Sequence, residues 1–315
     1  MKLFIEYEPN ESGKGKFISR LIPELEEWGV KICGKQEKAD IALSLTRFRS
    51  KFKGPRVLRV DGIHLVSSNK TYWNNDRVKK CINKADAVIW QSNFCCDVAK
   101  KVLKVKPKRE FQIYNGAPTD EFLVSKMDLG FKYNIFICGN FQSRKHKRLE
   151  DMLQISMEMD DPEIGWHVAG KIDIETPKSK RIKYLGVISR EKIARYLASC
   201  DLMLDLQTAS WCPNSVVEAL VAGCPVIGCK GAGSEELIKT EGVLIYDEPP
   251  TRMRDNEKYY KINHGEVISA IRGLLKTSSH FERKDLHISN IAKQYYRAIE
   301  QVLNDFNLAS KGDFL

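Results

Sequence analysis

Short apolar runs alternate with amphipathic stretches along the whole chain, and this alternation limits the possible folds more than any other feature. In the first half, runs typical of β-strands lie at Leu3–Tyr7, Ala39–Leu45, Arg56–Val60, Ala87–Gln91 and Phe111–Tyr114. Helical stretches separate several of them, as at Lys16–Trp28, which Gly29 closes, and at Asn93–Leu103. Alternating β and α elements predict a parallel sheet with helices on both faces, so the predicted fold class is α/β.

The same pattern restarts in the second half. Its strand-like runs are Tyr133–Cys138, Gly165–Ala169, Ile182–Leu185, Leu202–Leu206, Pro225–Cys229 and Val243–Tyr246. A length of 315 residues suits two such domains. We expect two Rossmann-like domains, residues 1–130 and residues 131–284, with a cleft between the carboxyl ends of their sheets. Residues 285–315 have apolar side chains at helical spacing, and we expect this segment to pack back toward the N-terminal domain.

The composition indicates a soluble protein of ordinary kind. Hydrophobic residues make up 43% and charged residues 29% of the chain, and no window reaches the roughly 18 apolar residues of a membrane span. Glu6 and Glu8 interrupt any apolar core of a signal peptide. The nine cysteines are odd in number and show no metal-ligand spacing, so we expect a cytoplasmic protein without a bound metal.

The positive charge is concentrated in the first half of the chain. Residues 1–130 contain 25 Lys and Arg against 16 Asp and Glu, whereas the remaining residues contain 26 against 25. Such asymmetry indicates an anionic partner for the N-terminal half, either a phosphate polymer or a membrane surface. A solvated lysine-rich face that serves solubility explains the charge equally well.

The most informative motif is Trp211–Ile227. It reads as a loop, a helix that begins near Asn214 and Ser215, a glycine that ends this helix, and a strand. The exposed N–H groups at such a helix start favour a diphosphate. Glu218 lies one turn into the helix, where a carboxylate can bind both hydroxyls of a ribose.

This stretch resembles the donor-site signature of family 4 glycosyltransferases, which have the GT-B fold, in the subgroup with Cys-Pro-Asn-Ser-Val-(Val/Ile)-Glu-Ala-Leu. The resemblance implies that Glu218 holds the nucleotide ribose and that the position eight residues earlier contacts the donor sugar. The family has a second glutamate there, and this chain has Ser210. An ordinary helix–strand unit, with Pro and Gly at its ends, is the alternative interpretation of the motif.

A second motif, Cys138–Glu150, follows the first strand of the second domain. The resemblance implies that an Arg and a Lys of this segment neutralise the donor diphosphate. Lys147 matches the lysine and Arg144 is the better match for the arginine, while Lys145, His146 and Arg148 leave the register open. Fixed cations would stabilise the charge that grows on a nucleoside diphosphate leaving group. Asn140 of the same loop is a further candidate for donor binding.

Two weaker motifs lie in the first domain. Gly13 and Gly15 stand between the first strand and helix, and they resemble the glycine-bearing loop through which the backbone of GT-B proteins approaches the donor. Asp61 and His64 follow the strand Arg56–Val60, where the family often has a polar residue that faces the reacting sugar. Spacing does not choose between Asp61 and His64. A plain strand-to-helix turn is the alternative interpretation of the glycines, and a purely structural role is the alternative for His64.

The resemblance implies a retaining glycosyltransferase that uses no metal or other cofactor and transfers a hexosyl or pentosyl group from a UDP- or GDP-linked sugar to an acceptor hydroxyl. Nothing in the sequence matches the Asp-x-Asp metal motif of the other large glycosyltransferase fold. The alternatives from other classes are a catalytically silent module that binds a nucleotide or nucleic acid and, less favoured, a sugar-nucleotide epimerase. Ser210 favours the silent module, and Glu218 and Lys147 favour the enzyme.

The acceptor is left open between two anionic classes. Arg47, Arg49, Lys51 and Lys53 alternate with aromatic residues in the N-terminal domain. Such a surface suits anionic lipid headgroups, as for an enzyme at the membrane surface that extends a glycan or a lipid carrier. It also suits a nucleic-acid backbone, as for glycosylation of a hydroxylated DNA base, and the aromatic alternation points this way. Family base rates favour the glycan or lipid carrier.

Overall fold

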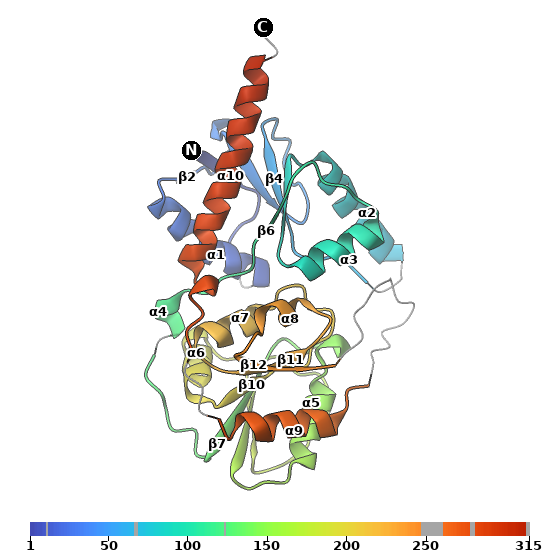
Figure 1. Cartoon of the computed structure of the whole chain (residues 1–315), viewed down its shortest axis with the longest axis vertical. Helices are drawn as coiled ribbons and strands as arrows, with labels where there is room; N and C mark the ends of the chain where they lie inside the picture. The colour runs from blue at the N-terminus through green and yellow to red at the C-terminus, as the bar shows by residue number, and fades with distance from the viewer. Residues whose placement is uncertain (11, 66–68, 123, 247–260, 278–280, 313–315) are drawn as a thin grey trace. The chain divides into compact units, whose positions relative to one another are not determined.

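The computed structural model describes residues 1–10, 12–65, 69–122, 124–246, 261–277 and 281–312. The chain forms two compact units. One contains Met1–Gly116 and the segment that begins at His287, and the other lies between Ala117 and Leu286. Each unit has a six-stranded parallel sheet with helices, so the expected α/β class and the GT-B arrangement of two Rossmann-like domains are confirmed (Figure 1).

The sheet of the first unit has the strand order β2-β1-β3-β4-β5-β6. Its strands are β1 (Lys2–Ile5), β2 (Lys31–Ile32), β3 (Ile41–Leu45), β4 (Arg56–Val60), β5 (Ala87–Trp90) and β6 (Glu110–Gln112). Its helices are α1 (Gly13–Glu27), α2 (Asn69–Lys84), α3 (Asn93–Leu103) and α10 (Ile288–Gly312), with a 3-10 turn η1 (Gln36–Lys38). β3, β4 and β5 are buried along their whole length, which explains their continuous apolar character.

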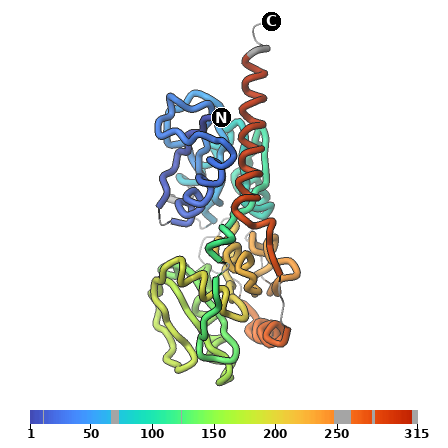
Figure 2. The backbone as a smooth tube through the Cα atoms, turned by 90° about the vertical axis from the view of Figure 1, so that its left-hand side faces the viewer, coloured from blue at the N-terminus to red at the C-terminus, as the bar shows by residue number. Residues whose placement is uncertain are grey.

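Helix α10 belongs to the first unit although it is last in the sequence. It packs beside α1 (Figures 1 and 2), and the Phe17 and Tyr295 rings lie 5.5 Å apart. Its apolar side chains share one core cluster with α1 and with alternate residues of β1 and β3, such as Leu3 and Leu43. The two helices therefore cover the same face of the sheet.

The sheet of the second unit has the order β12-β11-β10-β7-β8-β9. Its strands are β7 (Tyr133–Cys138), β8 (Ile164–Ala169), β9 (Ile182–Gly186), β10 (Leu202–Leu204), β11 (Val226–Cys229) and β12 (Gly242–Ile245). Its helices are α4 (Thr119–Phe122), α5 (Leu149–Glu158), α6 (Arg190–Ser199), α7 (Asn214–Val221), α8 (Gly233–Leu237) and α9 (His264–Leu274), with 3-10 turns η2 (Lys145–Lys147) and η3 (Lys284–Leu286). α5 and α9 share one core cluster with the sheet, whereas α6 contacts α4 and α7.

The division between the units falls after Gly116, whereas the sequence places it after residue 130. The short helix α4 packs on α6 and α7, and Glu121 pairs with Arg190 at 2.8 Å. Residues that connect the two sheets in sequence thus make their contacts with the second unit.

Candidate functional site

The basic loop after β7 is held in a defined shape. Ser143 and Arg148 have positive φ values of 53°, which is uncommon for residues other than glycine and is often found at functional sites. The Ser143 N–H donates to the Asp173 carboxylate at 2.6 Å. The Phe141 N–H donates to the Lys171 carbonyl at 2.9 Å. These bonds fix the loop against the segment that follows β8.

The structure distinguishes the basic residues of this loop. Arg144 and Lys145 are exposed, and His146 and Lys147 are half-buried. Arg148 is buried, and its guanidinium donates to the Leu206 carbonyl at 3.3 Å. Because Arg148 points into the protein, Arg144, Lys145 and Lys147 remain as cations of this loop, and Arg144 and Lys147 are the two that the resemblance matches to the diphosphate.

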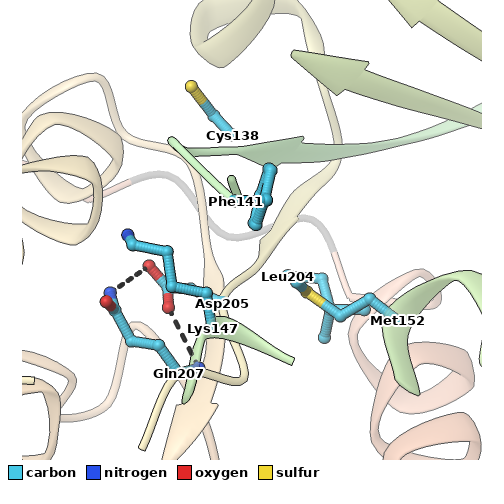
Figure 3. Close-up of a pocket in the computed structure, with 7 residues that line it drawn as sticks. All are labelled: Cys138, Phe141, Lys147, Met152, Leu204, Asp205 and Gln207. Atoms are coloured by element: carbon cyan, nitrogen blue, oxygen red, sulfur yellow. Dashed lines mark hydrogen bonds between the residues drawn. The ribbon is translucent and has the colours of Figure 1, made fainter. Parts of the chain in front are cut away.

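Lys147 lines a small pocket at the carboxyl ends of β7 and β10 (Figure 3). The lining residues are Cys138, Phe141, Lys147, Met152, Leu204, Asp205 and Gln207. Burial lowers the pKa of the Lys147 ammonium, while the charge of Asp205 opposes this effect. Burial, together with the charges of Lys147 and Arg144, lowers the pKa of His146 to about 4. His146 is therefore neutral at physiological pH.

Asp205 is the acidic member of this pocket and is 6% exposed. One of its oxygens accepts from the Gln207 side-chain amide at 2.8 Å and from the Ser215 hydroxyl at 3.0 Å. The other accepts from the Gln207 N–H at 3.3 Å. Figure 3 shows the Gln207 side chain folded back onto the carboxylate. Burial raises the pKa of Asp205, against the effect of Lys147 and of these hydrogen bonds.

The helix predicted from the motif Trp211–Ile227 is α7, and it begins at Asn214 as expected. Its cap residue, Pro213, makes no side-chain hydrogen bond to the first turn. The N-terminus of this helix therefore offers its dipole to an anion, while the Ser215 hydroxyl is used inside the protein by Asp205. Glu218 lies one turn further along α7 and is half-buried.

Ser210 lies in the loop between β10 and α7 and is buried. Its hydroxyl bonds with the Ser234 hydroxyl at 2.8 Å, and its carbonyl accepts from the Gly233 N–H at 2.6 Å. A Cβ at Gly233 would lie 2.0 Å from the Trp211 carbonyl oxygen, so this close approach to α8 requires glycine. Ser210 thus joins the loop between β10 and α7 to the first turn of α8.

Gly13 and Gly15 occupy the first turn of α1, which Ser12 caps by accepting from the Gly15 N–H at 3.2 Å. A Cβ at Gly15 would lie 2.3 Å from the Asn10 carbonyl oxygen. The packing of its own turn therefore accounts for glycine at position 15. Asn140, at the start of the basic loop of the second unit, is exposed.

Asp61 and His64 have different environments at the end of β4. Asp61 pairs with Arg59 at 2.8 Å and with Lys14 at 3.5 Å, and it accepts hydrogen bonds from Thr46 and Gln91 at 2.9 Å each. These partners engage both carboxylate oxygens, so Asp61 organises the carboxyl edge of the first sheet.

Asn75 bonds both main-chain polar groups of His64, at 3.0 and 2.8 Å, and the His64 side chain is exposed. Of the two residues that the sequence left as alternatives, His64 thus has the side chain that an external group can reach.

Buried Glu6 organises the segment 47–53. Its carboxylate pairs with Arg56 at 3.1 Å, accepts from the Ser50 N–H at 3.1 Å, and accepts from the Ser50 hydroxyl. The Arg56 guanidinium lies 4.5 Å from the Phe48 ring centroid and 5.7 Å from that of Phe52. The aromatic residues of this segment therefore pack against Arg56 of the same unit. The side chains of Arg49, Lys51 and Lys53 are exposed and that of Arg47 is half-buried.

The second unit brings together Lys147, Ser215 and the start of α7, whereas Gly13, Gly15, Asp61, His64 and the basic segment lie in the first unit. Sequence reasoning missed Asp205 and Gln207. A signal for Asp205 was present, because it is the one charged residue in the apolar run Leu202–Leu206. In the part of the chain that the structure describes, no group of three or more His, Cys, Asp or Glu is placed to hold a metal ion, and no helix has the length and apolarity to span a bilayer.

Comparisons with known proteins bear on the fold and on the second unit. Residues 132–256 match the sequence model of the family described as "Glycosyl transferases group 1". This range contains β7, the basic loop, Asp205 and α7. No curated protein has a significantly similar sequence.

Solved structures share the fold over nearly their full length. Sucrose-phosphate synthase from Thermosynechococcus elongatus aligns with a TM-score of 0.67 at 13% identity, covering 99% of this chain and 98% of the other. HepE from Anabaena, in complex with UDP and glucose, aligns with a TM-score of 0.60 at 13% identity over 100% and 99%. A glycosyltransferase from Rickettsia africae gives 0.63 at 11% identity over 96% and 98%. The chain thus has the fold of these proteins, and its residues 132–256 resemble the glycosyl transferase group 1 domain.

Proposed function

We propose that the protein is a glycosyltransferase that takes a sugar from a nucleotide-sugar donor bound in its second unit. One observation carries this proposal. Within the range that matches the glycosyl transferase family, the loop after β7 and the loop after β10 place Lys147 beside a pocket whose acidic residue also anchors the start of α7. A lysine and a helix N-terminus at the carboxyl edge of a parallel sheet suit a diphosphate.

In the proposed reaction, the bond between the sugar and the diphosphate breaks while an acceptor hydroxyl forms the new bond on the same face of the sugar, and the proton of that hydroxyl passes to the departing diphosphate. Lys147, Arg144 and the first turn of α7 stabilise the negative charge that grows on the departing diphosphate. Glu218 binds the ribose hydroxyls. Attack on the same face as the leaving group retains the anomeric configuration. Because no carboxylate of the protein is proposed as a nucleophile, the reaction has no covalent intermediate.

We propose a UDP-linked sugar as the first donor to test, because the HepE structure that shares this fold contains UDP and glucose. GDP-linked sugars are the alternative donor class. The protein needs no further cofactor in this proposal, since its own cations serve the diphosphate.

For the acceptor we propose a glycan or lipid carrier. The exposed cations Arg49, Lys51 and Lys53 favour an anionic acceptor. Phe48 and Phe52, the rings that suggested stacking on nucleic-acid bases, lie against Arg56. This observation weakens the case for a DNA acceptor.

The decisive experiment measures binding and turnover separately. The melting temperature is recorded with UDP, GDP, UDP-glucose and GDP-mannose, because a ligand that binds only the folded state raises it. Slow hydrolysis of the best-binding nucleotide sugar is then assayed. Binding with hydrolysis supports the enzyme. Binding of the nucleotide without any hydrolysis or transfer would support the catalytically silent module instead, and binding of none would refute both.

A further inference from the structure

Asp205 is a carboxylate in a place where burial is costly. It follows β10 directly and is 6% exposed, and it lines the same pocket as Leu204, Met152 and Phe141. Moving a carboxylate out of water costs several kcal/mol unless other groups compensate. A hydrophobic residue would suit this buried position after β10 better, so the carboxylate calls for an explanation.

The three hydrogen bonds of Asp205 favour its ionised form, against the effect of burial on its pKa. The Gln207 N–H, the Gln207 amide and the Ser215 hydroxyl all act as donors to it. An ionised carboxylate is purely an acceptor, which fits three donors. Because Ser215 is the second residue of α7, this bond also fixes the first turn of that helix to the end of β10.

The loop that contains Asp205 is joined to the loop that contains Lys147. The Thr208 N–H donates to the His146 carbonyl at 2.9 Å, and Arg148 donates to the Leu206 carbonyl at 3.3 Å. The two loops therefore hold Asp205 and Lys147 at fixed positions on one pocket wall (Figure 3).

Three charged or titratable groups act on the Lys147 amine, and a fourth, His146, precedes it directly in the loop. Asp205 comes from the end of β10, Cys138 from the end of β7, and Arg144 and His146 from the loop of Lys147 itself. Burial and Arg144 disfavour the charged amine, whereas Asp205 and Cys138 favour it. Asp205 is the stronger of the two favourable groups.

We propose that Asp205 is a positioning residue of the donor site, which anchors the first turn of α7 through Ser215 and holds a fixed negative charge beside the Lys147 ammonium. The inference rests on the proposed function, in which Lys147 and α7 bind the donor diphosphate. Asp205 itself does not touch the donor. It keeps Lys147 charged in a pocket that would otherwise favour the neutral amine.

The test compares UDP affinity across pH for the wild type and Asp205→Asn, measured by calorimetry from about pH 6.5 to about pH 9.5. Without Asp205 the pKa of Lys147 falls further, so the amine loses its proton at lower pH. The ratio of the variant's Kd to the wild-type Kd is therefore expected to rise with pH, by up to about tenfold per pH unit on the alkaline limb. Titration of uracil cancels in this ratio.

Three further variants isolate the cause. Asp201→Asn is the matched control, because Asp201 lies at the other end of the same strand, where it accepts from the Asn134 N–H at 2.6 Å, and burial raises its pKa as well. Its Kd ratio is expected to stay near one at every pH. Ser215→Ala removes only the anchor of α7 and should weaken UDP binding equally at every pH. In a Lys147→Arg background, Asp205→Asn should lose its pH dependence, because a guanidinium stays charged.

A Kd ratio of Asp205→Asn to wild type that is constant across pH would overturn the inference. A variant whose donor site is only structurally disturbed would weaken UDP binding equally at every pH. The same ratio slope in the Lys147→Arg background would overturn it too. Failure of the wild type to bind UDP or GDP at any pH would instead refute the proposed function. Should Asp205→Asn not fold, a Ser215→Ala variant that binds UDP as tightly as the wild type refutes the anchoring.

Discussion

Neighbouring basic residues in the loop after β7 have opposite environments. Lys147 lines the pocket, while Arg148, with a φ of 53°, turns inward to the carbonyl of Leu206. The sequence offers five basic side chains in a row and no rule for which of them points inward. The backbone conformation decides this, and a left-handed residue other than glycine cannot be predicted from residue type.

Lys147→Ala and Glu218→Ala are each expected to reduce transfer by two to three decades, because loss of a charge-assisted bond to a growing anion or to the donor costs about 3–4 kcal/mol. Steady-state kinetics with the donor identified by binding measures this loss. Lys145→Ala is the control, since Lys145 is an exposed neighbour in the same turn. Near wild-type rates in both variants would show that the donor site lies elsewhere.

His167 is a buried histidine whose pKa affects how stability depends on pH. It is fully buried, and its Nε2 bonds with the Asn134 side-chain oxygen at 2.9 Å. Asn134 donates its amide to the Phe131 carbonyl, so its oxygen accepts and the Nε2 of His167 donates. No residue within the described ranges bonds Nδ1. Burial lowers the pKa of His167 to about 4, with Lys183 contributing.

His167→Gln is therefore expected to make the protein less sensitive to acid. In the unfolded chain a histidine takes up its proton below about pH 6.5, while folded His167 does so only near pH 4, so stability falls as pH drops through this window. The histidine costs about 3 kcal/mol at the acid end. Denaturant titrations at neutral and acid pH measure the difference. The amide of Gln can donate to Asn134 in place of Nε2. If the wild type and His167→Gln lost the same free energy of unfolding between neutral and acid pH, the lowered pKa of His167 would be contradicted.

At the scale of elements, apolar runs predicted most strands well because a buried parallel strand is apolar on both faces. β4, β7 and α3 have the bounds that the sequence indicates. Leu202–Leu206 was expected to be a strand throughout, yet β10 ends at Leu204 and Asp205 begins the functional loop. Helix α2 was not predicted, because its sequence is strongly polar on average. Strand ends depend on tertiary contacts, which no local pattern contains.

Helix α7 supports a prediction about metals. Its N-terminus and the cations Lys147 and Arg144 can balance the two charges of a diphosphate. Activity is therefore expected to be unchanged after dialysis against EDTA. Transfer rates before and after chelation, and after addition of Mg²⁺ or Mn²⁺, measure this. Complete loss with EDTA and recovery with a divalent ion would contradict the proposed mechanism.

The packing of helix α10 leads to a prediction about the free energy of unfolding. Ile291 is fully buried between α10 and the first sheet, whereas Leu308 of the same helix is 69% exposed. Ile291→Ala is expected to cost about 2–5 kcal/mol, and Leu308→Ala well under 1 kcal/mol. Denaturant unfolding of both variants gives the comparison. Equal effects would mean that α10 does not complete the core of the first unit.

At the scale of the whole molecule, charge is distributed by unit. The net charge of +10 comes almost entirely from residues 1–130. This asymmetry follows from the residue count alone and needs no structure. The sequence could not show that Phe48 and Phe52 contact Arg56, because alternation along a segment does not say which side chains turn inward. The exposed cations of this segment are therefore separable from its aromatic residues by mutation.

The last prediction concerns these exposed cations. If Arg49, Lys51 and Lys53 meet an anionic acceptor, changing all three to Gln should raise the acceptor KM and reduce its salt dependence, because each neutralised phosphate releases counterions. The affinity for UDP should stay the same, since the proposed donor site lies in the second unit. Lys171, Lys178 and Lys180 are exposed lysines of the second unit, and their triple Gln variant removes the same charge as a control. Binding to vesicles with anionic lipid and to duplex DNA, each at several salt concentrations, identifies the class of acceptor. A specific binding surface would make the variant of the first unit bind more weakly than the control variant. If the two triple variants bind vesicles and DNA equally well, the charge of the first unit serves solubility.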